Sequence, residues 1–117
     1  MNFFEGVTTD NAELRLADGT TLQLHQQIAP AGTSVTIGAR PEHIELGTEG
    51  WAAEAVVIEP TGSETQITVR IGSSTARVLV RGRPNVRAGD RIHLGVSPRY
   101  LHVFSTETGL AMTAEGA

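Results

Sequence analysis

The chain contains an internal repeat, and this repeat restricts the fold more than any other feature of the sequence. Residues 31–46 and 88–103 align without a gap at a constant offset of 57 positions. Each copy reads as a turn, a strand, a turn led by proline and a second strand. The positions that agree are Ala31/Ala88, Gly32/Gly89, Val35/Ile92, Ile37/Leu94, Gly38/Gly95, Pro41/Pro98, Ile44/Leu101 and Leu46/Val103. The repeat therefore predicts two similar units.

Alternation of apolar and polar residues with period two recurs along the chain, and a helical period does not. Residues 13–16 and 21–24 both alternate, and Asp18-Gly19 between them is a strong hairpin signal. In residues 65–71, Thr65, Ile67, Val69 and Ile71 stand at every second position and share one face of a strand. Gly72-Ser73-Ser74 then leads into the alternating residues 76–81. The apolar residues 51–58 end at Glu59-Pro60, where we expect pairing to stop. These patterns predict an all-β fold.

The repeat and the alternation together indicate two small barrel-like halves of about five strands each. They resemble oligonucleotide/oligosaccharide-binding (OB) folds. The helices we expect are single turns that begin at Pro41 and Pro98. We predict one domain over residues 1–117, with halves near 1–50 and 51–117 that are either separate or interleaved. Residues 47–50, Gly-Thr-Glu-Gly, are the natural joint between the halves.

Composition removes several classes of function. The chain has no cysteine, which excludes disulfides and thiolate chemistry, and no lysine, which excludes a Schiff base and a phosphate loop with its lysine. A net charge of −4 disfavours general binding to nucleic acid. No apolar run is long enough for a membrane span, and the N-terminus lacks the basic residues of a secretion signal. We therefore expect a cytoplasmic domain without redox chemistry.

No catalytic or metal-binding motif is present. None of the four histidines, His25, His43, His93 and His102, has a ligand-like spacing to another, although His93 and His102 could meet on neighbouring strands. An independent hydrolase would need acid–base carboxylates, for which Glu42, Glu59 and Glu64 lie nearest to turns. We predict no catalytic residue, no metal site and no cofactor in this chain.

Two segments are candidates for binding. Residues 81–87, Arg-Gly-Arg-Pro-Asn-Val-Arg, form the one basic cluster, which fits a solvated hairpin end better than an anion or protein contact, and nucleic acid least. Residues 62–65, Gly-Ser-Glu-Thr, could offer hydroxyl and backbone N–H groups to a small oxyanion. Thr61, Ser63 and Arg81 are the candidate ligands of such an anion, against the simpler interpretation of an ordinary turn.

Several motifs resemble the C-terminal region of ATP-binding cassette (ABC) ATPases that import carbohydrates. Residues 1–6 are similar to the junction that follows the nucleotide-binding domain, and residues 38–44 to a Gly-x-Arg-Pro-Glu-His motif. The remaining similarity lies in residues 57–65, 88–92 and 101–104 and in Gly109. The order and spacing of these motifs hold over roughly residues 1–113. The chain thus resembles the transport-associated OB (TOBE) domain of the maltose and glycerol-phosphate importer type.

This resemblance implies a pair of OB-like halves that act as a regulatory and dimerising module of an ATPase subunit. The implied partners are a second copy, an upstream nucleotide-binding domain, membrane subunits of the transporter and, in some relatives, a regulatory protein. The implied location is the inner face of the cell membrane. The family motifs place structural or regulatory roles on Arg40, Pro41, Glu42, His43, Gly62, Ser63 and Glu64. For Arg40 we expect a buried ion pair with a carboxylate.

The motifs that bind and hydrolyse ATP are absent from this chain, so we expect no ATPase activity from it. ATP and magnesium would belong to an upstream domain, and the chain would then be a fragment that begins at an internal Met1. The alternative is a stand-alone TOBE domain that binds a small oxyanion or another solute, as molybdate-type relatives do.

Overall fold

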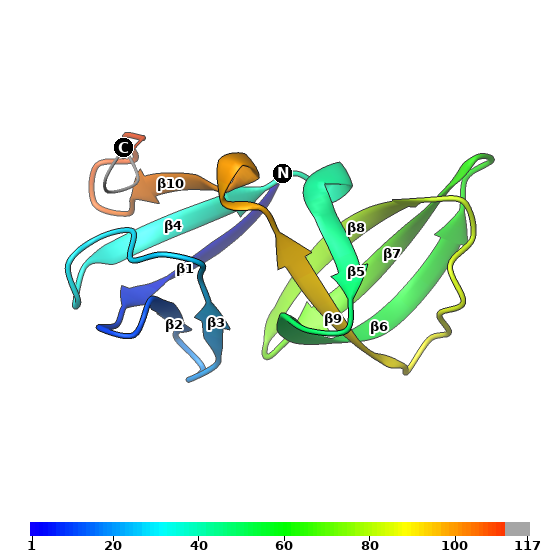
Figure 1. The fold of residues 1–117 in the computed structure, drawn as a ribbon, viewed down its shortest axis with the longest axis horizontal. Helices are drawn as coiled ribbons and strands as arrows, with labels where there is room; N and C mark the ends of the chain where they lie inside the picture. Colours follow the sequence, from blue (N-terminus) through cyan, green and yellow to red (C-terminus); the bar gives the residue numbers. More distant parts are fainter. Residues whose placement is uncertain (112–117) are drawn as a thin grey trace.

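The computed structural model describes residues 1–111 and consists of two five-stranded antiparallel sheets side by side, with overall extents of 41 × 25 × 23 Å (Figure 1). Lobe 1 has the strand order β10 (His102–Ser105), β4 (Ser34–Ala39), β1 (Asn2–Thr8), β2 (Glu13–Leu16) and β3 (Thr21–Gln23). Lobe 2 has the order β5 (Ile44–Gly47), β9 (Arg91–Val96), β6 (Trp51–Pro60), β7 (Glu64–Ile71) and β8 (Ser74–Arg81). The prediction of an all-β fold is confirmed. The last two residues of the motif-bearing stretch 1–113 lie outside the described residues.

Both expected hairpins are present. The β2–β3 hairpin turns through Asp18-Gly19, and Gly19 has the positive φ of 92° that such a turn requires. The β7–β8 hairpin is joined by two residues, Gly72 and Ser73. The alternation in β7 corresponds to burial, because its odd-numbered apolar residues are buried while the polar residues between them are more exposed. The sequence period therefore identified the core face of this strand.

Strand β6 is longer than the sequence predicts. Pairing does not stop before Glu59-Pro60 but continues to Pro60, which lies opposite Thr65. Proline is tolerated there because Pro60 is the last residue of the strand before the turn. The turn is closed by a hydrogen bond from the backbone N–H of Thr61 to the Glu64 carbonyl, at 2.7 Å. A bulge between Ala55 and Val57 shifts the β6–β7 register and bends the strand.

The two single-turn helices lie where proline predicts them. Helix η1 (Pro41–His43) joins β4 to β5, and helix η2 (Pro98–Tyr100) joins β9 to β10. Proline fits the first position because its fixed φ suits a helix and its missing N–H would have no helical partner. Neither single turn, nor any other helix in residues 1–111, is long and apolar enough to cross a bilayer.

The lobes exchange strands with each other. After β4 in lobe 1 the chain passes through η1 and enters lobe 2 as β5, and after β9 in lobe 2 it passes through η2 and returns to lobe 1 as β10 (Figure 1). The registers of the two exchanged strands match. His102 lies opposite Gly38, and Glu45 lies opposite Gly95, which are the same positions in the two copies of the repeat.

This exchange gives the repeat its structural meaning. Each copy contributes a central strand to one lobe and an edge strand to the other, so residues 44–47 belong with lobe 2 and residues 102–105 with lobe 1. The expected halves 1–50 and 51–117 thus contribute strands to both sheets. The expected joint at residues 47–50 is instead a turn between β5 and β6 of the same sheet, and the crossings between lobes are η1 and η2.

A pseudo-twofold relationship extends to side chains at the interface between the lobes, which we call the seam. Phe4 and Trp51 hold the same register positions, because Phe4 lies opposite Ile37 and Trp51 lies opposite Leu94, its repeat counterpart. Their rings meet edge to face, with centroids 5.8 Å apart. The repeat counterparts His43 and Tyr100 also meet, as stacked rings 4.0 Å apart. Equivalent residues therefore contact each other across the seam.

Backbone-directed hydrogen bonds hold the other side of the seam. The Asn2 side chain accepts from the Arg77 N–H at 2.9 Å and donates to the Arg77 carbonyl at 2.8 Å, as a paired strand residue would. Asp18 Oδ2 accepts from the Ser73 N–H at 2.7 Å. These bonds join β1 and the β2–β3 turn of lobe 1 to β8 and the β7–β8 turn of lobe 2.

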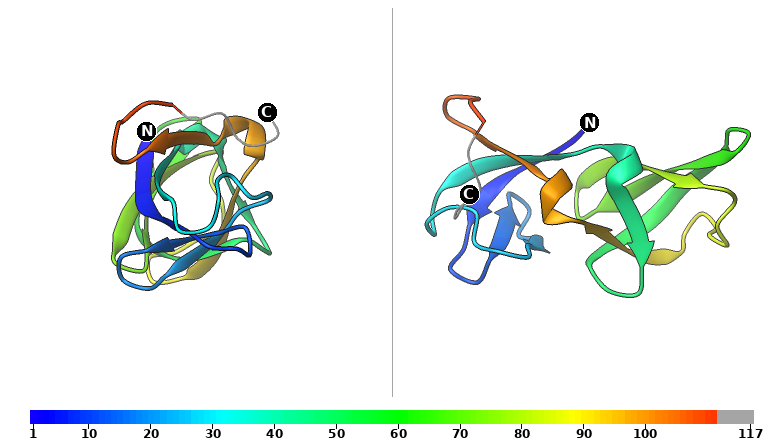
Figure 2. Two further views of the ribbon diagram at one scale, coloured as in Figure 1. Left: turned by 90° about the vertical axis from the view of Figure 1, so that its left-hand side faces the viewer. Right: turned by 45° about the horizontal axis from the view of Figure 1, so that its top comes forward.

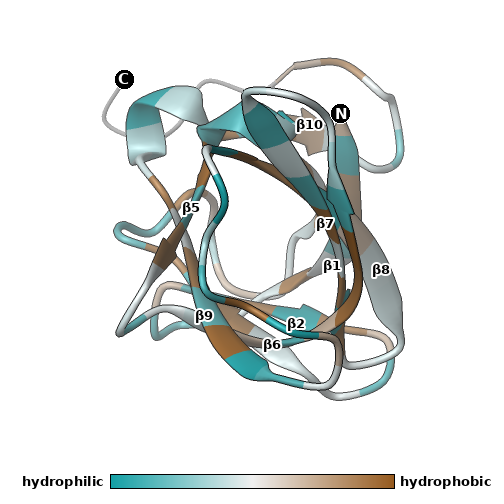
Figure 3. Ribbon diagram, turned by 90° about the vertical axis from the view of Figure 1, so that its right-hand side faces the viewer, coloured by the Kyte–Doolittle hydropathy of each residue, from teal (hydrophilic) through white to brown (hydrophobic). Residues whose placement is uncertain are grey.

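The buried apolar side chains of the two lobes form one continuous core. In lobe 2, β5 and η1 lie against β8, which brings the two edges of the sheet together. The end-on views show the strands of both lobes wrapped around a centre (Figures 2 and 3). The side chains with no exposed surface are divided between the lobes: Leu14, Leu22, Val35 and Ile37 in lobe 1, and Ala55, Ile67, Val69, Val78 and Leu94 in lobe 2.

Candidate functional site

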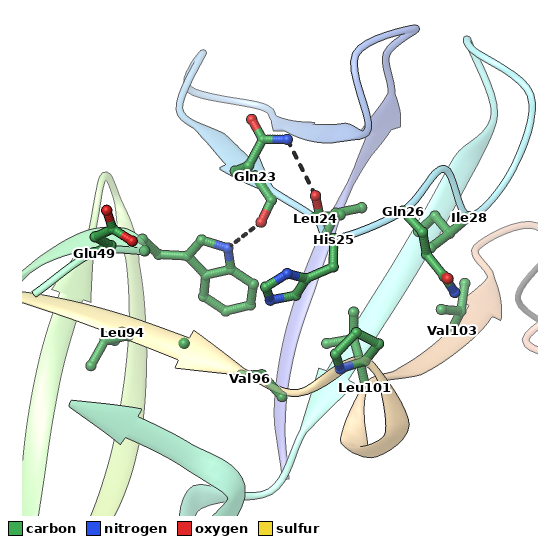
Figure 4. Close-up of a pocket in the computed structure, with 14 residues that line it drawn as sticks. Gln23, Leu24, His25, Gln26, Ile28, Glu49, Leu94, Val96, Leu101 and Val103 are labelled. Atoms are coloured by element: carbon green, nitrogen blue, oxygen red, sulfur yellow. Dashed lines mark hydrogen bonds between the residues drawn. The ribbon is translucent and has the colours of Figure 1, made fainter. Parts of the chain in front are cut away.

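A cavity of about 360 Å³ opens on the seam. One wall comes from the end of β3 and the following chain, the opposite wall from β9, η2 and the start of β10, and one end from the β5–β6 turn (Figure 4). We call it the seam pocket. Its lining residues are Gln23, Leu24, His25, Gln26, Ile28, Glu49, Gly50, Trp51, Leu94, Gly95, Val96, Pro98, Leu101 and Val103.

The floor of the seam pocket is apolar. Leu24, Ile28, Trp51, Val96 and Val103 belong to the hydrophobic core and are only 4–6% exposed. All five also line the cavity, so the cavity opens directly onto the hydrophobic core. A ligand there would cover apolar side chains that the fold already holds in place.

The indole of Trp51 is held by a hydrogen bond that crosses the seam. Its Nε1–H donates to the Gln23 carbonyl at 2.8 Å, so a residue of lobe 2 is bonded to the end of β3 in lobe 1 (Figure 4). The Gln23 amide in turn donates to the Asn11, Ala12 and Leu24 carbonyls at 3.2–3.3 Å. This wall is therefore formed before any ligand arrives, and the indole N–H is not free to bind one.

Polar side chains surround the mouth. His25 and Gln26 project from the chain after β3, with Gln26 directed toward Val103, and Glu49 lies at the other end on the β5–β6 turn (Figure 4). All three are exposed. None of the side-chain hydrogen bonds found among residues 1–111 uses them, so they are able to bind a group at the mouth. Glu49 is the one carboxylate in the lining.

The family-motif residues of η1 lie at the seam but do not line the pocket. Arg40 precedes the helix in an extended conformation and is exposed, so the expectation of a buried ion pair is wrong. The ion pair found within the described residues joins Arg70 to Glu54 at 3.2 Å instead. Glu42 is exposed in the same turn, and Pro41 starts it.

His43 is the motif residue with a distinctive environment. Its ring stacks on Tyr100, and its Nδ1 atom is buried without a hydrogen-bond partner among the described residues. Arg99 lies over the other aromatic partner, 5.3 Å from the centre of the Tyr100 ring. The ring of His43 thus contributes packing at the crossing of the two helices.

The second group of motif residues lies at the far end of lobe 2, in the β6–β7 turn. The Thr61 N–H and hydroxyl both point to the Glu64 carbonyl, at 2.7 and 3.2 Å, and the Ser63 carbonyl accepts from the Gly82 N–H at 2.7 Å. Arg81 lies opposite Glu64 in the strand register. The candidate oxyanion ligands Thr61, Ser63 and Arg81 therefore lie at the same end of lobe 2. However, the Thr61 hydroxyl already donates to the Glu64 carbonyl, and Glu64 lies opposite Arg81 in the strand pair.

The other titratable candidates are spread over the fold. His93 is in β9 of lobe 2 and His102 in β10 of lobe 1, so the two histidines, which the sequence allowed to meet on neighbouring strands, lie in different sheets. Within the described range no three histidine, aspartate or glutamate side chains are grouped as metal ligands. Glu42 lies in η1, whereas Glu59 and Glu64 lie in the β6–β7 hairpin. In the arginine-rich 81–87 segment, Arg87 donates its N–H to Asp90 at 2.9 Å.

One carboxylate has a strongly altered acidity. The backbone N–H of Thr20 and then that of Ser73 stabilise ionised Asp18 and lower its pKa from 3.8 to about 2. Asp18 is exposed and its acceptor positions point to backbone, so it acts as a clamp between the lobes. Sequence reasoning assigned it to a turn and missed this second partner, because Ser73 is 55 residues away.

The seam pocket was also missed. Its lining comes from three stretches of the chain, residues 23–28, 49–51 and 94–103, and no motif connects them. The sequence holds one weak signal for this pocket. The apolar residues Leu24 and Ile28 follow β3, beyond the end of the strand, where polar residues are more usual.

Comparison with known proteins gives consistent results along the chain. The MalK OB fold domain matches residues 1–44, and the TOBE domain matches residues 37–104. An uncharacterised ABC transporter ATP-binding protein, y4oS of Sinorhizobium fredii, is 39% identical over 112 residues, which are 93% of this chain and 30% of that protein.

Two further relatives have transport functions in their names. The sn-glycerol-3-phosphate import ATP-binding protein UgpC of Bordetella parapertussis is 32% identical over 93% of this chain and 32% of its own length. The maltose/maltodextrin import ATP-binding protein MalK of Vibrio cholerae is 28% identical over 90% of this chain and 30% of its own length. The chain therefore spans about a third of the curated relatives that it matches.

The fold is also similar to a solved structure. The cytoplasmic molybdate-binding protein ModG, crystallised with molybdate bound, superposes with a TM-score of 0.69 over 87% of this chain and 94% of that one, at 14% identity. At that identity the likeness concerns the fold alone. From the two domain matches, which together cover residues 1–104, we conclude that this chain belongs to the TOBE domain family.

Proposed function

We propose that this chain is the C-terminal regulatory and dimerisation domain of the ATP-binding subunit of an ABC transporter that imports a sugar or a related solute. One observation carries the proposal: relatives named as import ATP-binding proteins align with 90% or more of this chain but with only about a third of their own length. The remaining two thirds would contain the nucleotide-binding domain, which would bind ATP and magnesium.

The surface of lobe 1 supports a role within an assembly. On the outer side of β1 and β10, Phe3 is 58% exposed and meets Phe104 edge to face, with centroids 6.3 Å apart, and Met1 beside them is 47% exposed. We call this the outer aromatic face. Apolar side chains gathered on one exposed face are typical of contact surfaces. In the proposed subunit this face would be covered by the rest of the transporter complex.

The physical advantage of such a domain is tethering. Two subunits held together by their C-terminal domains keep a high effective concentration of their ATPase domains while these open and close. A twofold dimer would use the same patch on both copies. The subunit would lie at the inner face of the membrane through contacts with membrane-embedded partners, and a regulatory protein would have access to the exposed parts of the domain.

The first experiment is to identify the natural polypeptide that contains this sequence, by mass spectrometry of peptides from source cells. We expect a product about three times larger, including a peptide with the Lys-Ser or Lys-Thr of a phosphate loop. Sedimentation of the purified parent with and without residues 1–117 then tests dimerisation, and we expect the truncated protein to dimerise less. A native product of only 12.4 kDa would refute the proposal.

The alternative is a stand-alone domain that binds a small oxyanion, and its support is the fold likeness to a molybdate-binding protein. The β6–β7 turn offers little for this role, because the Thr61 hydroxyl already donates to Glu64. Calorimetry with molybdate, sulfate and phosphate distinguishes the two. Saturable heat with one of these anions would favour the alternative.

A further inference from the structure

We propose that the seam pocket binds a small amphipathic molecule, with a hydrocarbon body of about eight to twelve carbon atoms and a head group that is neutral or cationic and donates hydrogen bonds. This inference goes beyond the proposed function and does not depend on it. It rests on the shape of the pocket, the chemistry of its floor and the charge at its mouth.

The size of the pocket sets the size of the ligand. An apolar cavity of about 150 Å³ holds a benzene molecule, which has six carbon atoms. At 360 Å³ the seam pocket has room for roughly twice that number of non-hydrogen atoms. It also lies within the range of about 300–1,000 Å³ that is usual for small-molecule sites.

Equivalent positions in the two lobes differ at the pocket, and the pseudo-twofold relationship shows which residues to compare. In lobe 1, Phe3 and Met1 lie over Gly38, so closely that a Cβ atom at Gly38 would meet both. Trp51 corresponds to Phe4 in register, so Gly50, which directly precedes Trp51, corresponds to Phe3, and Gly95 is the repeat counterpart of Gly38. Both of these glycines line the pocket, and a Cβ atom at Gly95 would meet nothing within 4 Å. Lobe 2 thus lacks the aromatic side chain that covers the equivalent glycine in lobe 1.

The floor favours a hydrocarbon body. The side chains of Leu24, Ile28, Val96, Leu101 and Val103 offer no hydrogen bond, and the one polar atom of the Trp51 ring already donates to Gln23. A ligand with polar groups along its whole length, such as a free sugar or a hydrated oxyanion, would lose hydrogen bonds with water there without replacement.

The mouth sets the preference for the head group. Glu49 supplies a carboxylate, and His25 and Gln26 supply further polar atoms that no hydrogen bond within the described residues uses. The whole chain carries a net charge of −4. A carboxylate at the mouth of a negatively charged protein attracts an ammonium group and repels an anionic one. A hydroxyl head can donate a hydrogen bond to the same carboxylate.

The protein contains its own reporter for this test, because Trp51 is its single tryptophan and lines the pocket. We would titrate the chain with 1-butanol, 1-hexanol and 1-octanol, and with octylamine and octanoate at neutral pH, and follow tryptophan fluorescence. Saturable binding should tighten by about fourfold for each added methylene, since each buried methylene contributes a nearly constant free energy. Octylamine should bind more tightly than octanoate.

Two pairs of variants locate the site. Val96→Thr places a hydroxyl on the floor with little change in shape and should weaken 1-octanol binding by about three- to tenfold. Val80→Thr, on a partly buried residue of β8 outside the pocket, is its control. Glu49→Gln should reduce the preference for octylamine over octanoate by about two- to fivefold and leave 1-octanol unchanged. Glu45→Gln, an exposed site on β5, makes the same change of charge away from the mouth.

The outcomes that overturn the proposal are also specific. If fluorescence changes without saturation up to the solubility of 1-octanol, or if Val80→Thr weakens binding as much as Val96→Thr, the pocket is not the site. If Phe3→Ser abolishes binding, the ligand lies on the outer aromatic face instead. If octanoate binds as well as octylamine to both wild type and Glu49→Gln, the assigned head group is wrong. Should Val96→Thr fail to fold, Glu49→Gln at the exposed mouth still decides the case.

Discussion

His43 stacks on Tyr100 with ring centroids 4.0 Å apart and planes inclined by only 21°, and the two residues occupy the same position in the two copies of the internal repeat. The contact lies where η1 and η2 carry the chain from one lobe to the other. A residue and its own repeat counterpart can meet in this way only near a local twofold axis. The stack therefore lies close to the pseudo-twofold axis that relates the two lobes.

Removing the stack should weaken the seam. We expect Tyr100→Ala to lower the free energy of unfolding by about 0.5–1.5 kcal/mol, the usual contribution of an aromatic pair beyond simple burial. Urea unfolding followed by circular dichroism measures this change. Tyr100→Phe keeps the ring and loses only the hydroxyl, so it should remain close to wild type. An equal loss in both variants would show that the hydroxyl, not the stack, stabilises the fold.

The Asp18 clamp should make stability depend on pH. Its pKa is lowered from 3.8 to about 2 by the N–H groups of Thr20 and Ser73, so the ionised form stabilises the folded state. That contribution is complete above about pH 4 and disappears as the pH falls through about 2. We expect Asp18→Asn to be less stable than wild type at pH 6, with the difference vanishing between pH 4 and 2. Urea titrations at several pH values measure this, and Asp10→Asn, at an exposed aspartate, is the control.

Gly72 should resist substitution for two separable reasons. It has a positive φ of 58°, and a Cβ atom there would overlap Asp18 Oδ2 and Thr20 Oγ1 of the other lobe. Gly62 also has a positive φ, of 87°, but a Cβ atom there would meet nothing within 4 Å. We expect Gly62→Ala to cost about 1–2 kcal/mol from backbone strain alone, and Gly72→Ala to cost more. Thermal unfolding measures the stability of the two variants. An equal loss of stability in both would show that the contact of Gly72 with Asp18 and Thr20 adds nothing to the cost of the substitution.

The indole of Trp51 should contribute through both its ring and its N–H. Trp51→Phe keeps an aromatic ring near Phe4 but leaves the Gln23 carbonyl without its donor, at an expected cost of about 1–3 kcal/mol. Trp51→Ala also opens a cavity and should cost about 3–5 kcal/mol. Chemical unfolding followed by circular dichroism tests both. A Trp51→Phe variant as stable as wild type would show that the hydrogen bond between the lobes contributes nothing.

The sequence predicts the strands of this protein well because their local signals agree with burial. In β7 the alternation, the glycine turn and the buried face coincide, and at Asp18-Gly19 the turn chemistry alone places a hairpin. The proline-led turns were predictable because Pro41 and Pro98 determine their own backbone conformation.

The sequence does not predict which sheet a strand joins. Alternation in β5 and β10 shows which side chains are buried, but it contains no information on the partner strand. The sequence therefore left separate and interleaved halves both open, and the structure shows that strands are exchanged. The same holds for the seam pocket and for the bond from Asp18 to Ser73. Both depend on segments that are far apart in the chain, and a burial pattern can be satisfied by many such arrangements.

The exchange of strands also determines when each lobe can be completed during synthesis. Among the described residues 1–111, lobe 1 contains both the first strand, β1, and the last, β10, so a nascent chain that ends at residue 90 has supplied only four of the five strands of lobe 1. The edge of β4 stays uncovered until residues 102–105 have been made, and until then it can pair with another chain. We therefore expect stalled or truncated products that end before residue 102 to associate with one another through β4.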